Sequence, residues 1–133
     1  MREVLFRGKC KDNDKWIEGY YTCFNGKEHR IYNGYAETDC GDYYPDWEAV
    51  SPETVGQYTG LTDKNGKRIF EGDIVIGLFI FGLSVNAVVI FRDGAFGLKW
   101  NRGSVETFNA FTSICNVTFE VIGNIHDNTV QGG

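Results

Sequence analysis

Glu71 and Asp73 flank Gly72, and two carboxylates so close together could be a catalytic pair. Paired carboxylates can perform general acid–base catalysis when they occupy different environments around a cleft. A turn that leads into a strand explains the same residues, because glycine permits unusual backbone angles and aspartate accepts hydrogen bonds from nearby amides. We therefore predict a structural turn here, and we interpret Asp63 and Asn65 in the same way.

Histidine and cysteine side chains could supply a nucleophile or a metal site, but their spacing supports neither. His29 and His126 are isolated in the sequence, whereas a nucleophile needs a histidine within hydrogen-bond reach. A zinc site is usually built from closely spaced ligand pairs, and the cysteines at positions 10, 23, 40 and 115 form no C-x-x-C pair. The sequence predicts no catalytic residue, no metal, no cofactor and reduced thiols.

An aromatic and acidic stretch, residues 36–47, contains the best candidates for contact with a partner. It has no strand or helix periodicity, so we predict a long loop. Tyr43, Tyr44 and Trp47 lie in this stretch. Tyrosine and tryptophan are enriched where proteins meet, because they bury a large rigid area at small entropic cost. These three side chains are our predicted binding residues, and the alternative is that the loop packs on the predicted barrel or on the N-terminal subdomain.

Composition and charge are typical of a globular protein that is poorly suited to nucleic acid. Of 133 residues, 42% are hydrophobic and 23% are charged. The net charge of -5 repels a phosphate backbone, and no run of five basic residues offsets it. The N-terminus lacks the apolar run of a signal peptide, and the longest apolar stretch, residues 74–83, is about half the length of a membrane helix. We expect a cytoplasmic protein without membrane contact.

Side chains alternate with a period of two along most of the chain, which predicts a mostly β fold with at most short helical turns. The dipeptides Asn-Gly at 25–26 and Asp-Gly at 93–94 are typical of tight hairpin turns. A single helical turn is expected at residues 51–54. Residues 108–115 fit a strand or a short helix, and both alternatives stay open. The predicted strands are residues 3–9, 16–22, 29–32, 57–61, 67–70, 74–81, 86–91, 96–100, 104–108 and 117–121.

Strands between residues 67 and 125, joined by tight turns, are numerous enough for a small closed barrel, which would leave no exposed strand edge. We predict this barrel within residues 51–126. Residues 1–50 are expected to form an N-terminal β-rich subdomain that carries the long acidic and aromatic loop. The polar, glycine-ended residues 127–133 are expected to fray.

Three segments carry a resemblance to a known family. The central one, residues 52–75, reads PETVGQYTGLTDKNGKRIFEGDIV. The second is the VIGNI run at 121–125 followed by Asp127 and Asn128, and the third is Phe6 and Arg7 followed by residues 16–20. Together they resemble the YopX family of phage and prophage proteins. The resemblance implies a mostly β fold with an SH3-like C-terminal barrel, a phage or prophage origin and self-association, but no established activity.

We therefore expect a phage- or prophage-encoded protein in the bacterial cytoplasm that is not an enzyme. Its expected role is an oligomeric assembly or protein-interaction module, with itself and a phage or host protein as partners. The alternative is a small β-barrel that binds nucleic acid, because aromatic platforms on such barrels suit single strands. The acidic net charge disfavours this alternative.

Overall fold

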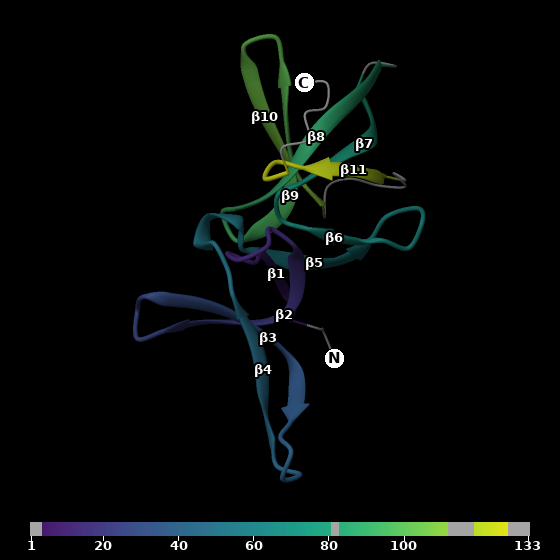
Figure 1. The fold of residues 1–133 in the computed structure, drawn as a ribbon. Coiled ribbons are helices and arrows are strands. Elements are labelled where there is room, and N and C mark those ends of the chain that lie inside the picture. The colour runs from purple at the N-terminus through teal and green to yellow at the C-terminus, as the bar shows by residue number, and fades with distance from the viewer. Residues whose placement is uncertain (1–3, 81–82, 112–118, 128–133) are drawn as a thin grey trace. The chain divides into compact units, whose positions relative to one another are not determined.

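A computed structural model describes residues 4–80, 83–111 and 119–127. The strands within them form two antiparallel sheets, as the period-two pattern predicts, and a single turn of 3₁₀ helix, η1 (Pro52–Thr54), stands at the predicted helical turn. The chain divides into two compact units, Met1–Tyr58 and Thr59–Gly133. Strand β5 (Gly56–Thr62) runs across this division (Figure 1).

The N-terminal unit is built from four strands in the order β4-β3-β2-β1, with the beginning of β5 paired to the free side of β1. Its buried side chains include Ile31, Val50 and Cys10. Cys10 and Val50 also form an antiparallel bridge that joins the end of β1 to the end of β4. The strands are β1 (Phe6–Lys9), β2 (Trp16–Phe24), β3 (Glu28–Glu37) and β4 (Tyr43–Ala49).

The long loop predicted at residues 36–47 is wrong, because most of that stretch is strand. β3 continues to Glu37, and β4 begins at Tyr43, so the two strands form the long hairpin seen in Figure 1. The stretch has no alternating hydrophobic pattern because the outer part of this hairpin has few buried side chains. Backbone pairing between β3 and β4 holds it extended instead.

The C-terminal unit contains a five-stranded antiparallel sheet in the order β10-β9-β8-β7-β11. Asp93 and Gly94, both at positive φ, form the predicted tight turn between β8 and β9. β6 is short and lies beside β5, as the predicted hairpin requires. The strands are β6 (Arg68–Phe70), β7 (Asp73–Ile80), β8 (Leu83–Arg92), β9 (Ala95–Arg102), β10 (Val105–Ala110) and β11 (Glu120–Asn124).

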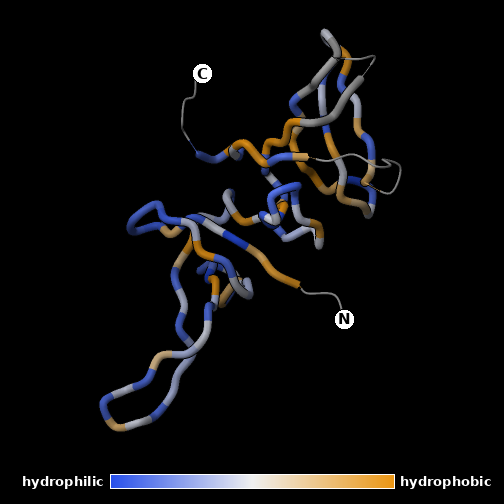
Figure 2. Tube along the Cα trace, turned by 90° about the vertical axis from the view of Figure 1, so that its right-hand side faces the viewer, coloured by the Kyte–Doolittle hydropathy of each residue, from blue (hydrophilic) through white to orange (hydrophobic). Residues whose placement is uncertain are grey.

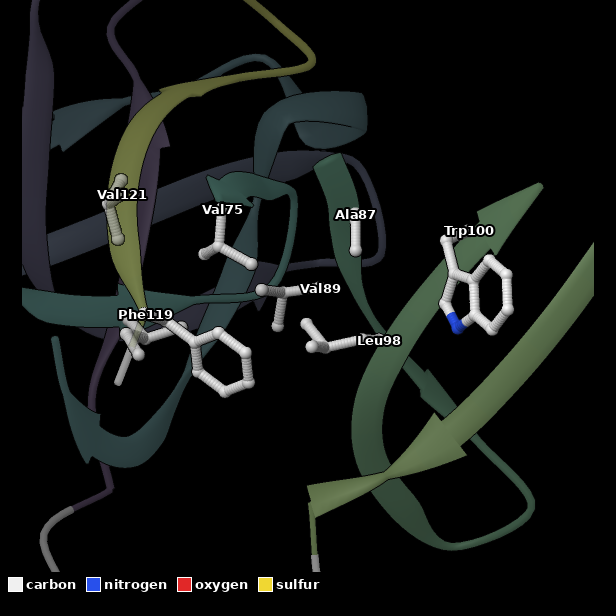
Figure 3. Packing of buried hydrophobic residues seen from close by; sticks show 8 residues of the cluster. Val75, Ala87, Val89, Leu98, Trp100, Phe119 and Val121 are labelled. Atoms are coloured by element: carbon white, nitrogen blue, oxygen red, sulfur yellow. The ribbon is translucent and has the colours of Figure 1, made fainter. Parts of the chain in front are cut away.

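One hydrophobic cluster forms the core of this unit, and Figure 3 shows its members converging from several strands. Val75, Val89 and Leu98 have no exposed surface, and burial of such side chains is the main source of stability in a small domain. The other members are Ile69, Ala87, Trp100, Phe119 and Val121. Trp100 also donates a hydrogen bond from Nε1 to Asn109 Oδ1 at 2.9 Å, so its polar atom is satisfied.

The closed barrel predicted for residues 51–126 is not present in the part of the chain that the structure describes. The five-stranded sheet is open, since β10 pairs with β9 and β11 pairs with β7, and no pairing joins β10 to β11 among the described residues. The SH3-like arrangement stays a prediction. Residues 108–110 belong to strand β10, whereas residues 112–118, which include part of the predicted helix or strand, lie outside the described residues.

Hydrophobic residues are unevenly distributed between the strands. In Figure 2 the C-terminal strands carry much of the orange colouring, whereas the long β3–β4 hairpin is mainly blue and white. Among the residues described, no helix has the length and apolar character needed to cross a bilayer.

Candidate functional site

One face of the β2–β3–β4 sheet is covered by aromatic side chains. Residues directly opposite each other in an antiparallel pair share a face, and alternate residues along a strand point the same way. Tyr20 lies opposite Tyr32, and Tyr32 lies opposite Trp47, so these three side chains share one face. We call this surface the aromatic face. Its members are Tyr20, Phe24, Arg30, Tyr32, Tyr35, Tyr43 and Trp47.

A bulge in β3 places Tyr35 on the aromatic face. Between the pairs Tyr32–Trp47 and Tyr35–Pro45, β3 contains one residue more than β4. An extra residue reverses the alternation of side chains, so Tyr32 and Tyr35 point to the same side although they are three positions apart. Gly34 within the bulge has a φ of 95°, a conformation that disfavours residues with a side chain. The sequence prediction ended a strand at this point, where the structure has a bulge.

Arg30 is held between two rings at the centre of the aromatic face. Its guanidinium carbon lies 3.9 Å from the centroid of Trp47 and 4.2 Å from that of Phe24. Its Nη1 donates to the Tyr32 hydroxyl at 3.0 Å, and its Nε donates to Glu28 at 2.7 Å. These hydrogen bonds, Tyr32 first and Glu28 after it, raise the Arg30 pKa. The face therefore contains a complete binding arrangement for one guanidinium group.

The outer members of the aromatic face are open to solvent. Tyr35, Tyr43 and Tyr20 are exposed at 75%, 71% and 66%, and Phe24 at 48%. Single exposed aromatic residues are normal on a protein surface, but several on one face mark a site of contact. Their rings are anchored on paired strands rather than on a loop, so little conformational entropy is lost when a partner covers them.

Acidic residues are concentrated on the β3–β4 hairpin and the residues around it. Residues 31–63 contain seven Asp or Glu residues and no Lys, Arg or His, so this segment carries a charge of -7 in a chain whose total is -5. Five of these carboxylates lie on the β3–β4 hairpin or its connection, at positions 37, 39, 42, 46 and 48. We call residues 35–48 the acidic arm. Glu37 lies opposite Tyr43 on the aromatic face, whereas Asp46 and Glu48 are one residue out of step with Trp47 and project from the other side of β4. The net charge of the arm favours a positively charged partner.

The predicted binding residues do not share one surface. Tyr43 and Trp47 lie on the aromatic face, while Tyr44 projects from the opposite side of β4 because it is one residue out of step. Trp47 is partly buried under Arg30. Sequence reasoning missed Tyr20, Phe24, Arg30 and Tyr35. Tyr20 and Phe24 are an even number of residues apart on β2, so strand periodicity alone places them on one face. The bulge in β3 changes the face on which Tyr35 lies, and periodicity does not predict that change.

A second cluster lies on the opposite face of β2 and β3. Cys23 pairs directly with His29 across the strands, and its Sγ is 3.9 Å from His29 Nε2. The Tyr21 hydroxyl is 2.7 Å from His29 Nδ1, and the two rings stack with an interplanar angle of 7°. Burial, with a smaller effect of Cys23, raises the Tyr21 pKa. His29 is isolated in the sequence but not in space, which corrects the prediction made from spacing alone.

The carboxylates singled out in the sequence are used to hold backbone. Asp73 is 1% exposed, and its Oδ2 accepts a hydrogen bond from the Phe70 amide at 2.8 Å. Asp63 Oδ1 accepts from the amides of Asn65 and Lys67 at 2.8 and 2.9 Å. The prediction of structural turns at both positions is confirmed. His126 lies near Gly72, where a Cβ would be 3.6 Å from its ring.

Comparison with known proteins identifies the chain's relatives. A family model described as YopX protein matches residues 5–130, nearly the whole length. The chain belongs to the YopX family. The resemblance predicted from the sequence is therefore confirmed. A search of curated proteins found no match.

The run of residues that carries the YopX resemblance has a structural role within the C-terminal unit. Asp63 Oδ2 accepts a hydrogen bond from the Val121 amide at 3.0 Å, and the Lys64 amide donates to the Phe119 carbonyl at 2.8 Å. Gly72 donates from its amide to Val89 and accepts from Ile125 through its carbonyl. This run therefore ties β7, β8 and β11 together, and the aromatic face lies outside it.

Proposed function

We propose that this YopX-family chain is a non-enzymatic protein-interaction module whose contact surface is the aromatic face. The observation that carries the proposal is the group of highly exposed rings on one face of β2–β4, above all Tyr20, Tyr35 and Tyr43. Water-exposed aromatic area of this extent is costly and is recovered when a partner covers it. The buried carboxylates Asp63 and Asp73 support a non-catalytic role, since their oxygens accept hydrogen bonds from backbone amides.

The proposed occupant is a protein segment that contains arginine. Charge complementarity favours it, because the acidic arm contributes carboxylates without a single cation. Arg30 supplies an internal example, with its guanidinium between Phe24 and Trp47 and its hydrogen bond to Glu28. An external arginine would find the exposed rings of Tyr35 and Tyr43 and the carboxylate of Glu37 on the same face of the acidic arm.

Nucleic acid is the less favoured occupant of this surface. Bases could stack on the exposed tyrosines, as they do on many single-strand-binding proteins. The phosphates of the same strand would then approach the carboxylates of the acidic arm, with no lysine or arginine from residue 31 to 63 to attract them. Repulsion therefore opposes stacking in this segment.

Binding of matched synthetic peptides tests the proposal. An arginine-rich peptide should bind more tightly than a lysine-rich peptide of equal length and charge, because only guanidinium groups stack well on the rings. Calorimetry should show affinity falling about fivefold or more for the double variant Tyr35→Ser/Tyr43→Ser. Tyr44→Ser is the matched control, since it removes the same ring from the other side of the same strand.

Three outcomes would contradict the proposal. Equal affinity for the arginine and lysine peptides would show that charge alone drives binding. An equal loss of affinity in Tyr44→Ser would remove the role of the aromatic face. Tight, salt-dependent binding of a single-stranded oligonucleotide, lost in Tyr35→Ser/Tyr43→Ser, would favour the nucleic-acid alternative.

Three further proposals follow from the sequence and from the family resemblance. We propose that the chain is encoded by a phage or prophage, that it acts in the cytoplasm of the bacterial host and that it associates with itself. The family match supports the first of these. Self-association is independent of the arginine-containing partner, and it is tested by its own measurement below.

A further inference from the structure

The Cys23–His29 cluster has the donor atoms and the separation of a small metal site. Cys23 and His29 are a directly opposed pair on β2 and β3, so both side chains leave the sheet on the same side. The Sγ to Nε2 distance is 3.9 Å. Two ligands of one tetrahedral zinc ion, at about 2.3 Å for sulfur and about 2.0 Å for nitrogen, are roughly 3.6 Å apart. A small side-chain rotation that moves either donor atom by a few tenths of an ångström would bring the two atoms to this separation.

Tyr21 orients the histidine in the way that metal-binding histidines require. Ligating histidines almost always form a hydrogen bond through their other ring nitrogen, which fixes the ring and the tautomer. The Tyr21 hydroxyl is 2.7 Å from Nδ1 and can accept a hydrogen bond from Nδ1–H. In that tautomer Nε2 carries the free lone pair, on the ring nitrogen that lies 3.9 Å from Cys23 Sγ. The stacked Tyr21 ring and the neighbouring Phe6 ring, 5.6 Å away, restrict the movement of this group.

We propose that Cys23 Sγ and His29 Nε2 bind one divalent ion of the zinc type. On binding, the S–H bond of Cys23 breaks and its proton passes to solvent, while one metal–sulfur and one metal–nitrogen bond form without any change in oxidation state. A thiolate and an imidazole are the ligands that zinc prefers to carboxylate or carbonyl oxygen. This proposal does not depend on the aromatic face, which lies on the other side of the sheet.

The site provides two ligands and leaves two positions open. Among the described residues no group of three or more His, Cys, Asp or Glu side chains could hold a metal. Cys23 is exposed, so water or a donor from a second molecule can reach the ion. A ratio of one ion per chain means that water completes the site, and one ion per two chains means that a second copy brings its own Cys23 and His29.

Cobalt(II) titration of the full chain is the direct test, because a thiolate–cobalt bond absorbs in the near ultraviolet and tetrahedral cobalt absorbs strongly in the visible range. Both bands should appear in the natural protein and saturate. Cys23→Ser should abolish the ultraviolet band, and His29→Gln should weaken binding at least about tenfold. Tyr21→Phe should weaken it about tenfold while both bands remain. Cys40→Ser, at another exposed thiol, should have no effect.

Alkylation of the unmodified chain keeps the test decisive if a variant fails to fold. Zinc should slow the reaction of Cys23 with iodoacetamide about tenfold or more, measured by peptide mass spectrometry, because a metal-bound thiolate is a poorer nucleophile and is shielded. Cys40 in the same sample should react at an unchanged rate. Equal rates for Cys23 with and without zinc, or a thiolate–cobalt band that persists in Cys23→Ser, would overturn the proposal.

Discussion

The carboxylate of Asp63 accepts a hydrogen bond from the backbone amide of Val121 at 3.0 Å, although the two residues are 58 positions apart. The same side chain also accepts from the amides of Asn65 and Lys67, so one residue shapes a turn and attaches the last strand to it. Asp63 is 7% exposed, and hydrogen bonds to a buried charged group are among the stronger ones in proteins.

Replacement of this carboxylate should destabilise the C-terminal unit. Asp63→Asn retains the shape but replaces one of the two accepting oxygens with an amide group that cannot accept. We expect the free energy of unfolding to fall by about 2–3 kcal/mol in urea denaturation at neutral pH. Asp93→Asn, at a solvent-exposed turn, is the control and should change stability by less than about 0.5 kcal/mol. Similar values for both variants would contradict the structural role of Asp63.

The hydrogen bonds to Asp63 also predict sensitivity to acid. The Val121 amide, with smaller contributions from Lys67 and Asn65, holds the Asp63 pKa below its usual 3.8 despite burial. A lowered pKa in the folded state means that this carboxylate stabilises the protein fully above pH 3.8 and that the contribution is lost as the pH falls through the folded value. Thermal melts below pH 4 should therefore show a steeper loss of stability in the natural protein than in Asp63→Asn. Parallel pH profiles for the two proteins would argue against this linkage.

Leu98 lies at the centre of the C-terminal core and has no exposed surface. Leu98→Ala should lower the free energy of unfolding by about 2–5 kcal/mol, because it removes buried apolar area and leaves a cavity. Leu61→Ala in the same unit is the matched control, since Leu61 is 45% exposed and should cost less than about 1 kcal/mol. Chemical denaturation of both variants gives the comparison. A small effect at Leu98 would mean that this core is loosely packed.

Gly97 in β9 has no room for a side chain. A Cβ there would lie 2.4 Å from the Asn109 carbonyl oxygen and 2.7 Å from the Ala110 Cα, so the backbone of β10 would have to move. We expect Gly97→Ala to destabilise the protein by about 2–3 kcal/mol, whereas Gly123→Ala, which meets nothing within 4 Å, should be nearly neutral. Melting temperatures of the two variants test this difference. An unchanged melting temperature for Gly97→Ala would show that β10 does not pack against Gly97 as closely as the structure indicates.

Self-association can be measured directly. Sedimentation velocity at micromolar concentration should show a species heavier than the 15.0 kDa monomer. The experiment should be repeated with a metal chelator, because an assembly that dissociates only then would depend on the proposed Cys23–His29 site. A plain monomer throughout this concentration range would remove self-association from the proposed properties of the chain.

Short-range patterns in the sequence determined much of the β structure. Asn25 and Gly26 both adopt the positive φ angles that a tight hairpin turn needs, and Asp93 and Gly94 do the same. Alternating side chains between Phe96 and Trp100 identified a strand with one buried face. The role of Asp63 as a turn residue also followed from its type and neighbours. These features depend on a few adjacent residues, so the sequence contains the information for them.

Pairing between distant segments decided the rest. β4 has no alternating pattern, and Pro45, Asp46 and Glu48 interrupt its strand-favouring Tyr and Trp residues, so its extended conformation depends on pairing with β3. The bulge at Gly34 moves Tyr35 onto the same face as Tyr43, and hairpin register brings Cys23 to His29. Strand register and the choice of paired edges are set by contacts across the sheet, which leave no local signature in the chain. The β-rich character was therefore readable from the sequence alone, while the open sheet, the aromatic face and the thiol–imidazole pair arose only on folding.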